Sequence, residues 1–279
     1  MSIHPSAVVS ADARVHASAV IGPHVVIDGP VVVAADVRIG PAAILLGATE
    51  IGAGVEIHSH AVIGDTPQDR RYAGEASRCV IGAGTIIREG VTIHRATGAG
   101  ETTIVGERCQ LMTNSHVAHN CRLGNDVLLI SGALLGGHVV VGDRAIVSGN
   151  TGVHQFVRIG ALAMVACVAP VTQDVPPYMM TDHQGRIVGL NSVGLRRAGY
   201  SATEREQLKL AYRLIYRTSL SRTQVIDRLE AEPPSTVLQT MLEFLRGSTD
   251  RGIVRGRSRP GDSTSAPATE ILEFTRRCA

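Results

Sequence analysis

The stretch that decides the fold is residues 105–171, which read in groups of six VGERCQ LMTNSH VAHNCR LGNDVL LISGAL LGGHVV VGDRAI VSGNTG VHQFVR IGALAM VACVAP V. Each group begins with Val, Leu or Ile. The same phase starts at Ile3, and 26 of its 29 positions from residue 3 to residue 171 are Val, Ile or Leu. An α-helix has a period of about 3.6 residues and a half-buried strand one of about 2. The six-residue period therefore predicts a hexapeptide repeat.

Small residues follow the same period. A small side chain stands two residues before many of the aliphatic positions, as at Ala19, Ala43 and Ala133. Such residues fit where strands bend. Hexads of this kind build an all-β fold, the parallel β-helix, in which three hexads make one triangular coil. Residues three hexads apart then stack on the same face of the resulting prism.

Three positions break the aliphatic phase and indicate where the chain leaves the coil. They are Asp69, Glu75 and Ala99. A carboxylate in an apolar core carries a prohibitive desolvation cost. We therefore predict a β-helix over residues 1–190 with loops at 66–79 and 95–103, and loops on rigid scaffolds often carry function.

The chain changes character after Val171, where the hexads stop. Ser201 and Glu204 have the spacing of a capping box that opens a helix. Further helices are predicted over about 221–231 and 235–246, which gives a small C-terminal α-helical domain over residues 191–255. The polar composition of residues 256–279 predicts a disordered tail, with a helical end over 270–277.

Composition limits the classes of function. The formal net charge of +2 argues against a strongly basic nucleic-acid-binding protein. Five cysteines without a Cys-x-x-Cys pair indicate neither a disulfide framework nor a zinc ribbon, and favour a reducing, cytoplasmic location. The sequence shows no pattern of a signal peptide and no apolar run long enough to span a membrane.

The histidines from His4 to His154 all avoid the inward positions of the hexads, so we expect them to point outward. Six are interpreted as solvated surface residues: His4, His16, His24, His58, His60 and His94. The column of His119 differs. Three hexads later stands Gly137, followed by His138, and three hexads further Gln155, preceded by His154. A base, a backbone N–H without side-chain cover and polar groups are the set that acyl transfer requires.

A series of motifs in fixed order closely resembles a known family. The motifs are Gln68-Asp69-x-x-Tyr72-Ala73-Gly74-Glu75, Ile93-His94-Arg95, His116-Val117-Ala118-His119, Gly137-His138, Val153-His154-Gln155-Phe156 and Gln173-Asp174-Val175-Pro176-Pro177-Tyr178. The family is the bacterial acyl-[acyl-carrier-protein]:UDP-N-acetylglucosamine O-acyltransferases, and the resemblance covers about residues 3–254. Hexads alone are shared by many acyltransferases, whereas this ordered set is specific.

The resemblance implies a left-handed β-helix and a homotrimer with active sites between neighbouring prisms. It implies transfer of a 3-hydroxyacyl chain from acyl carrier protein to the 3-position of UDP-N-acetylglucosamine, the first step of lipid A biosynthesis, without a cofactor or metal. His119 is then the general base and the Gly137 N–H the oxyanion donor. The implied substrate contacts are Gln68, Asp69, Arg71, His116, His138, His154, Gln155, Asn191 and Arg197. Met164 and Cys167 are implied to border the acyl-chain groove.

Two residues depart from the family pattern, and three alternatives stay open. Asn120 stands where the family commonly has Asp, and Arg71 where it commonly has Lys. The acceptor is therefore a 3-hydroxyl or the amine of a 3-amino sugar nucleotide. A zinc hydrase of the trimeric β-helix type would use His116, His119 and His138 as ligands. A non-catalytic scaffold that binds carrier protein is the third alternative.

Trimer formation has its own signal in the sequence. Leu128, Ile146 and Met164 are spaced by three hexads in an outward phase, so they are expected to form an apolar stripe. Monomeric proteins rarely expose such a stripe. We expect it to lie in the contact between subunits.

Overall fold

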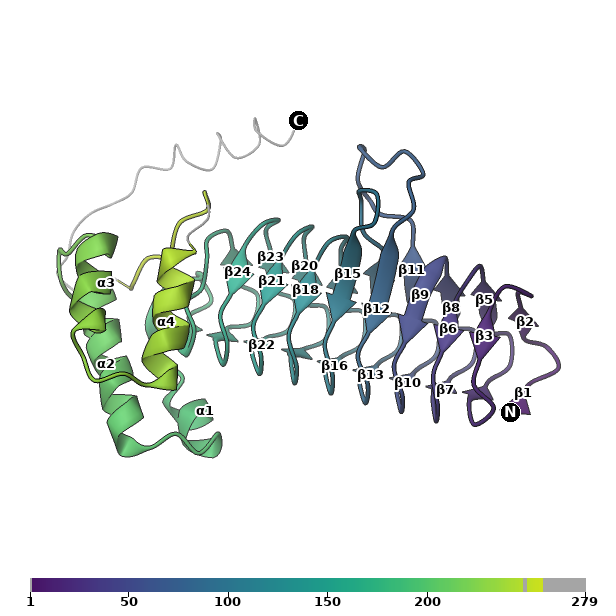
Figure 1. The fold of residues 1–279 in the computed structure, drawn as a ribbon, viewed down its shortest axis with the longest axis horizontal. Coiled ribbons are helices and arrows are strands. Elements are labelled where there is room, and N and C mark those ends of the chain that lie inside the picture. Colours follow the sequence, from purple (N-terminus) through teal and green to yellow (C-terminus); the bar gives the residue numbers. More distant parts are fainter. Residues whose placement is uncertain (1, 248–249, 258–279) are drawn as a thin grey trace.

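Short strands, most of them two residues long, are the repeating unit of this protein (Figure 1). The structure is a computed structural model and describes residues 2–247 and 250–257. In β22 (Ile146–Val147) the first residue is half-buried on the outside and the second is buried inside. The pattern recurs along the chain because successive side chains of a strand point to opposite faces and every hexad supplies one aliphatic residue to the inside.

The strands form three sheets, and each strand up to β23 pairs with the strand three places later in the chain. The eleven-stranded sheet contains β1 (Ser2–Ile3), β4 (Val20–Ile21), β7 (Arg38–Ile39), β10 (Glu56–Ile57), β13 (Ile86–Ile87), β16 (Gln110–Leu111), β19 (Leu128–Leu129), β22, β25 (Met164–Val165), β27 (Met179–Thr181) and β28 (Ile187–Leu190). The nine-stranded sheet contains β2 (Val8–Val9), β5 (Val26–Asp28), β8 (Ile44–Leu46), β11 (Val62–Asp65), β14 (Thr92–His94), β17 (His116–Val117), β20 (Leu134–Leu135), β23 (Gly152–Val153) and β26 (Pro170–Val171). The eight-stranded sheet contains β3 (Arg14–Val15), β6 (Val32–Val33), β9 (Ala48–Ile51), β12 (Arg78–Ile81), β15 (Thr102–Val105), β18 (Arg122–Leu123), β21 (Val140–Val141) and β24 (Arg158–Ile159).

The register of the strands gives the size of one coil. Leu128 lies opposite Ile146 in parallel strands, so one turn takes 18 residues. This parallel pairing, repeated up to β26, confirms the predicted parallel β-helix. The offset rises to 30 between Glu56 and Ile86 and to 24 between Ile86 and Gln110. Both values are multiples of six, so the insertions leave the phase of the hexads unchanged.

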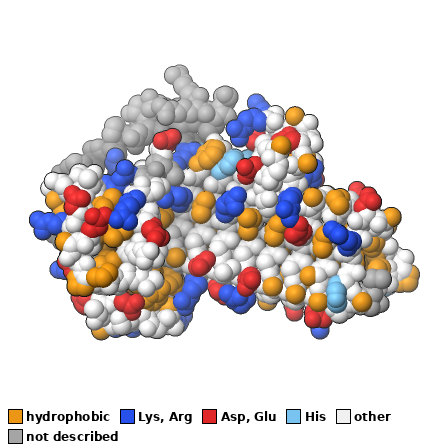
Figure 2. All heavy atoms as spheres, viewed as in Figure 1, with side chains coloured by type: hydrophobic (Ala, Val, Ile, Leu, Met, Phe, Trp, Pro, Cys, Tyr) orange, Lys and Arg blue, Asp and Glu red, His pale blue; other side chains and the backbone are white. Residues whose placement is uncertain are grey.

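Outward side chains carry charges of both signs. Figure 2 shows Lys and Arg side chains beside Asp and Glu along this face of the prism. Arg108, for example, lies within 2.7 Å of Glu107 and 2.9 Å of Asp126. The visible face therefore presents a mixed charge pattern, in keeping with the small net charge of +2.

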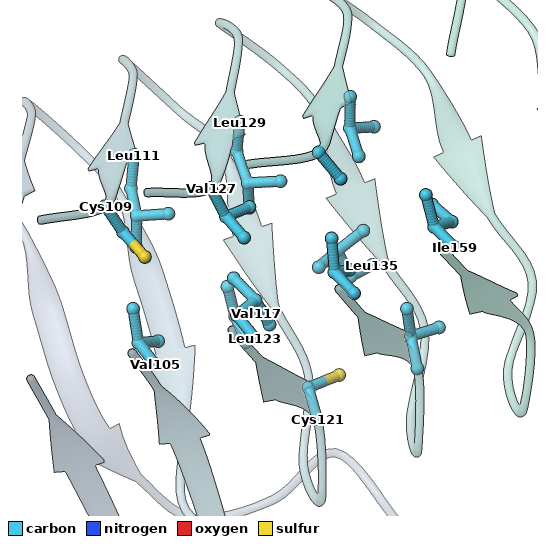
Figure 3. Close-up of a cluster of buried hydrophobic side chains, with 14 of the residues drawn as sticks. Val105, Cys109, Leu111, Val117, Cys121, Leu123, Val127, Leu129, Leu135 and Ile159 are labelled. Atoms are coloured by element: carbon cyan, nitrogen blue, oxygen red, sulfur yellow. The ribbon is translucent and has the colours of Figure 1, made fainter. Parts of the chain in front are cut away.

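Inward side chains fill the prism with stacked aliphatic groups. Figure 3 shows Leu111 and Leu129 on successive coils, with Val117 and Leu135 on the next sheet pointing toward the same interior. All four are fully buried. Each layer covers the apolar surface of the one before it, which is how a thin β-helix acquires a core.

Two loops leave the prism beside β12 and β15 (Figure 1). The first loop, residues 66–77, joins β11 to β12, and the second loop, residues 95–101, joins β14 to β15. Both end two residues earlier than the predicted ranges of 66–79 and 95–103. Cys79 and Thr103 already belong to the coil, where they lie opposite each other and are fully buried. Their small side chains fit the inward position beside a bend.

The C-terminal part departs from the coil. β27 pairs in parallel with β25, whereas β28 runs antiparallel to β27, so the last segment of the predicted 1–190 prism is a hairpin. Four helices follow: α1 (Ser192–Arg197), α2 (Ala202–Tyr216), α3 (Arg222–Glu230) and α4 (Thr236–Arg246). The expected capping box is present, since Ser201 and Glu204 each accept the backbone N–H of the other. Helix α1 is too short to show an apolar period and no sequence pattern predicted it.

A buried ion pair joins the helices to the prism. Arg158 of β24 lies 2.8 Å from the carboxylate of Asp174, donates to the carbonyl of Phe244 in α4 at 3.2 Å, and stacks over its ring at 4.3 Å. In the described part of the chain no helix has the length and apolar character needed to cross a bilayer. The predicted helical end at 270–277, and all of the predicted tail beyond Arg257, lie outside the described residues.

Candidate functional site

His119 stands at a corner of the prism between β17 and β18. Its imidazole lies against the backbone of the next coil, because a β-carbon at Gly137 would come within 2.6 Å of ring atoms Cε1 and Nε2. Only glycine leaves room for the ring here. Backbone bonds fix the stacked corners: the His138 N–H donates to His119 O and the Phe156 N–H to Gly137 O, each at 3.0 Å.

Asn120 sets the direction of the His119 imidazole. Its Oδ1 lies 2.9 Å from Nδ1 of His119 and also accepts the N–H of Thr97, while its Nδ2 donates to Thr97 O. The paired bonds to Thr97 define which end of the amide is oxygen. Because an amide oxygen only accepts, the proton of the neutral imidazole is on Nδ1. The Nε2 atom therefore carries the lone pair of a base.

The first loop brings a carboxylate to the other side of the ring. Asp69 Oδ2 lies 3.9 Å from His119 Nε2. Arg71 donates to the same carboxylate through its backbone N–H at 3.0 Å and through Nη2 at 3.0 Å. These bonds lower the pKa of Asp69 to about 2, so it is ionised at neutral pH.

His116 lies in β17, the strand that leads to the corner of His119, and its imidazole is held neutral. Its Nδ1 is 2.7 Å from Thr92 Oγ1, and its ring meets that of His94 edge-on at 5.2 Å. Burial lowers the pKa of His116 to about 4 and also lowers the pKa of His94. The interpretation of His94 as a solvated surface residue is wrong, because only 6% of it is exposed. It occupies an outward position, but it is buried and its ring packs edge-on against that of His116.

His138 lies between the base and Phe156. Its ring meets that of His119 edge-on at 5.2 Å and stacks on Phe156 at 4.6 Å. Burial lowers the pKa of His138, and the nearby His119 lowers it further. Among the described residues its buried Nε2 atom has no hydrogen-bond partner.

A groove of about 690 Å³ runs from His119 along the nine-stranded sheet. Six of the predicted site residues line it: Gln68, His116, His119, Gly137, His154 and Gln155. Its apolar lining includes Leu134, 49% exposed and opposite His116, and Val168, 66% exposed and further along the groove. Gly152 lies between them, and no heavy atom stands within 4 Å of where its β-carbon would be. The groove joins a polar end at the base to an open apolar end.

The backbone N–H of Gly137 lies on this groove. Within residues 2–247 and 250–257 it donates to no acceptor, whereas the N–H of the preceding Gly136 is bonded to Val153 O at 2.9 Å. An unpaired N–H beside a base is an arrangement that stabilises a developing oxyanion.

Seven predicted site residues do not line the groove. Asp69, Arg71 and His138 lie around His119 without lining it, and the other four are Met164, Cys167, Asn191 and Arg197. Cys167 precedes Val168, which does line it. Asn191 caps helix α1, where its Oδ1 accepts the Gly194 N–H at 2.9 Å and its Nδ2 donates to Leu162 O at 3.0 Å. Arg197 is exposed at the end of the same helix. A single chain therefore does not bring these four residues to His119.

Comparison with known proteins shows the family of this chain. Family models described as "Udp N-acetylglucosamine O-acyltransferase; Domain 2" and "GMPPB C-terminal domain" match residues 174–254 and 3–99. Acyl-[acyl-carrier-protein]--UDP-N-acetylglucosamine O-acyltransferases of Verminephrobacter eiseniae and Thiobacillus denitrificans are 43% and 44% identical, each over 91% of this chain and 99% of their own. The chain belongs to this acyltransferase family. The resemblance seen in the motifs is confirmed.

Solved structures of the acyltransferase family have the same fold. A UDP-N-acetylglucosamine acyltransferase from Bacteroides fragilis is 37% identical with a TM-score of 0.87, over 91% of this chain and 100% of that one. One from Arabidopsis is 32% identical with a TM-score of 0.71, over 92% and 100%. These values extend the family assignment across the prism and the helices.

Several residues at the site of this acyltransferase were not predicted from the sequence. Thr92, Thr97 and Phe156 orient His116, Asn120 and His138. Thr97 lies in a loop whose path has no hexad to define it. Phe156 belongs to one of the quoted motifs. It stands 36 residues, or two coils, after Asn120, and this spacing could have placed it at the corner of His119.

The zinc alternative finds no donor set in the described chain. No group of three or more His, Cys, Asp or Glu side chains in residues 2–247 and 250–257 is arranged to hold one metal ion. His116 and His138 each meet a different histidine, at ring distances of 5.2 Å.

The neutral histidines make stability depend on pH. His116 titrates near 6.5 in the unfolded chain and near 4 in the fold, so between these values the unfolded state binds more protons. The free energy of unfolding is expected to fall as pH drops from about 6.5 to about 4, and His94 and His138 act in the same direction. Asp69 lowers the free energy of unfolding only as the pH falls below 3.8, its ordinary pKa. Urea unfolding midpoints measured from pH 7 to pH 4.5 check this.

His116→Asn should flatten part of that slope, since the side chain then no longer titrates. The control is His24→Asn, an exposed residue at φ 57°, which asparagine tolerates. Equal slopes for His116→Asn and the unmutated protein would contradict the assignment.

Proposed function

We propose that this protein transfers a 3-hydroxyacyl chain from acyl carrier protein to the 3-position of UDP-N-acetylglucosamine, the first step of lipid A biosynthesis. The observation that carries the proposal is the pairing of a His119 Nε2 lone pair with the uncovered Gly137 N–H at the polar end of the groove. Family membership supplies the substrate class, because the relatives named above carry this activity in their names.

His119 acts as the general base. Its Nε2 takes the proton of the 3-hydroxyl as the sugar oxygen attacks the thioester carbonyl of the acyl donor. The new C–O bond forms, and the carbonyl electron pair moves onto the oxygen that accepts the Gly137 N–H. When the C–S bond breaks, the leaving thiolate takes the proton back from His119. Base and carrier thiol are regenerated without a cofactor or metal.

Asn120 orients the base but adds no charge. In the family pattern an aspartate at this place favours the imidazolium electrostatically. Here the ionised Asp69 supplies a negative charge 3.9 Å from Nε2, while Arg71 holds that carboxylate from the solvent side. The remaining polar contacts proposed for the sugar nucleotide are Gln68, His116, His138, His154 and Gln155.

The active enzyme is proposed to be a homotrimer. Leu128, Ile146 and Met164 pair in register as an outward apolar stripe, which Met180 extends by one strand. The exposed Leu134 and Val168 leave the groove open on one side. Asn191 and Arg197, which lie away from His119 in one chain, would reach the sugar nucleotide from a neighbouring subunit.

The apolar end of the groove is proposed to hold the acyl chain, with Cys167 limiting its length. Val168, the next residue, lines the groove, and Cys167 is exposed one coil beyond Gly149. Met164 is the first residue of β25, the strand that leads to the corner of Cys167. A cysteine side chain fills space that a glycine would leave open.

Other parts of the assignment follow from the family. We propose a left-handed β-helix over residues 1–190 and a C-terminal helical domain over 191–255. We also propose a cytoplasmic location, because the four cysteines in the described residues are free thiols. A 3-amino sugar nucleotide is the second candidate acceptor, favoured by the neutral Asn120: an amine nucleophile places less demand on a strong base.

Replacing His119 tests the reaction directly. His119→Ala should lower acyl transfer by about 10²–10⁴-fold, which is the typical contribution of general base catalysis. Transfer is measured with carrier-protein-bound 3-hydroxyacyl chains and both the hydroxyl and the amine sugar nucleotide. Near-normal turnover by a folded variant would contradict the assignment of His119 as the general base. If the unmutated protein binds acyl carrier protein but transfers no acyl chain, the result supports the alternative of a non-catalytic scaffold.

Charging the apolar stripe tests the trimer. Leu128→Asp or Ile146→Asp should give monomers in sedimentation velocity and abolish transfer, since an aspartate buried between subunits is unpaired. Gln110→Asp is the matched control, because it places the same charge one coil away in the same column, at a residue that is already polar and exposed. A monomer in the unmutated protein contradicts both the trimer and the shared site.

Enlarging the groove tests the chain-length assignment. Cys167→Gly should move the preference toward longer acyl chains, whereas Cys167→Ser, of similar size, should not. Each buried methylene is worth about 0.8 kcal/mol, and one forced into filled space costs about 1–3 kcal/mol, so chains two carbons apart should differ about tenfold or more. An unchanged preference in a competition assay places the end of the groove elsewhere, with Met164 the next residue to substitute.

A further inference from the structure

We propose that Glu75 is a positioning residue that holds His119 in its basic tautomer, acting through Gly98, Thr97 and Asn120. The inference rests on the proposed function, in which His119 is the general base. Glu75 lies in the first loop and does not line the groove. Its influence on the reaction is therefore transmitted through the second loop.

The first link ties the two loops together. One carboxylate oxygen of Glu75 accepts the Ala73 N–H of its own loop at 2.8 Å, and the other accepts the Gly98 N–H of the second loop at 2.7 Å. Gly98 has φ 102°, a conformation that other residues rarely adopt. These bonds to backbone N–H groups lower the pKa of Glu75, so the bridging carboxylate is ionised at neutral pH.

The second link runs from the neighbouring residue to the amide of Asn120. The Thr97 N–H donates to Asn120 Oδ1 at 2.9 Å, and Asn120 Nδ2 donates to Thr97 O at 3.0 Å. Asn120 N–H is separately bonded to Thr103 Oγ1 at 2.8 Å. The backbone of Asn120 is thus fixed by the coil, while the direction of its side chain depends on where the second loop places Thr97.

The third link reaches the base. Asn120 Oδ1 lies 2.9 Å from His119 Nδ1 and keeps the proton there. If the turn at Thr97 and Gly98 shifts, this acceptor moves and the imidazole populates both tautomers. The tautomer with its proton on Nε2 has no lone pair toward the groove and takes no proton from the acceptor sugar. Loss of Glu75 should therefore lower kcat more than it raises KM.

Loss of Glu75 should leave the fold intact. The second loop keeps backbone bonds to the rest of the chain: Gly100 N–H donates to Ala76 O at 2.8 Å, and Ala96 N–H to Arg78 O at 3.3 Å. Both anchor points lie outside the turn that Glu75 holds. The substitution then moves one turn without detaching the loop, which separates a positioning effect from unfolding.

The test compares Glu75→Ala and Glu75→Gln with a matched control. Glutamine keeps one acceptor oxygen and loses the other, so the kcat of Glu75→Gln should lie between that of Glu75→Ala and that of the unmutated protein. Glu101→Gln removes a charge at the end of the same loop, from an exposed side chain that accepts no hydrogen bond in the described structure. Kinetics should show kcat lowered about 10²-fold in Glu75→Ala, the scale of a misplaced catalytic group, with Glu101→Gln unchanged.

A second measurement reads the tautomer itself. ¹⁵N chemical shifts of His119 in histidine-labelled protein, assigned by comparison with His119→Gln, should report Nδ1–H in the unmutated chain and a mixture in Glu75→Ala. An unchanged tautomer in Glu75→Ala, or an equal loss of activity in Glu101→Gln, overturns the proposal. If the unmutated protein transfers no acyl chain, the proposed function fails on its own, and the tautomer measurement still decides the role of Glu75.

Discussion

The stacking of one coil on the next is the constraint on which the structure depends. Each short strand is too small to bury its inward side chain alone, and becomes stable only when the coils before and after it cover that side chain. The 18-residue register, seen between Leu128 and Ile146, carries this condition through the prism. The insertions in this chain are multiples of six, so the aliphatic residues after them keep the same phase. Chemistry is consequently confined to outward corners and to loops.

The site uses both of these places. The corner supplies the rigid part, where His119 packs against the backbone of Gly137 so closely that no side chain fits between them. The two loops supply the adaptable part: Asp69 approaches from the first, and Thr97 aligns Asn120 from the second. Backbone bonds along the coil set the position of the base, while the second loop, through Asn120, decides which ring nitrogen carries the proton. A rigid frame with polar loops around it is the arrangement that catalysis by positioning requires.

Burial explains why a surface on the outside of a thin prism can hold neutral histidines. His94 and His116 pack edge-on against each other, and burial away from water lowers the pKa of both. His138 is covered by Phe156 on one side and His119 on the other. The resulting row of neutral rings is able to donate or accept hydrogen bonds without adding positive charge beside the base. Arg71 balances the negative charge of Asp69 at the rim.

The sequence by itself determined the parallel coil, its phase, the capping box at Ser201 and the family, because a six-residue period and an ordered set of motifs are local patterns. It also placed His119, Gly137, His138 and Gln155 in neighbouring coils, since stacking converts a spacing of 18 into proximity. Only the tertiary structure decided that His94 is buried, that β28 turns back antiparallel, and that Asn120 fixes the proton of the base through Thr97. These features depend on where two loops and a hairpin fold against the prism. No period governs such segments, and their paths are set by hydrogen bonds to residues far away in the chain.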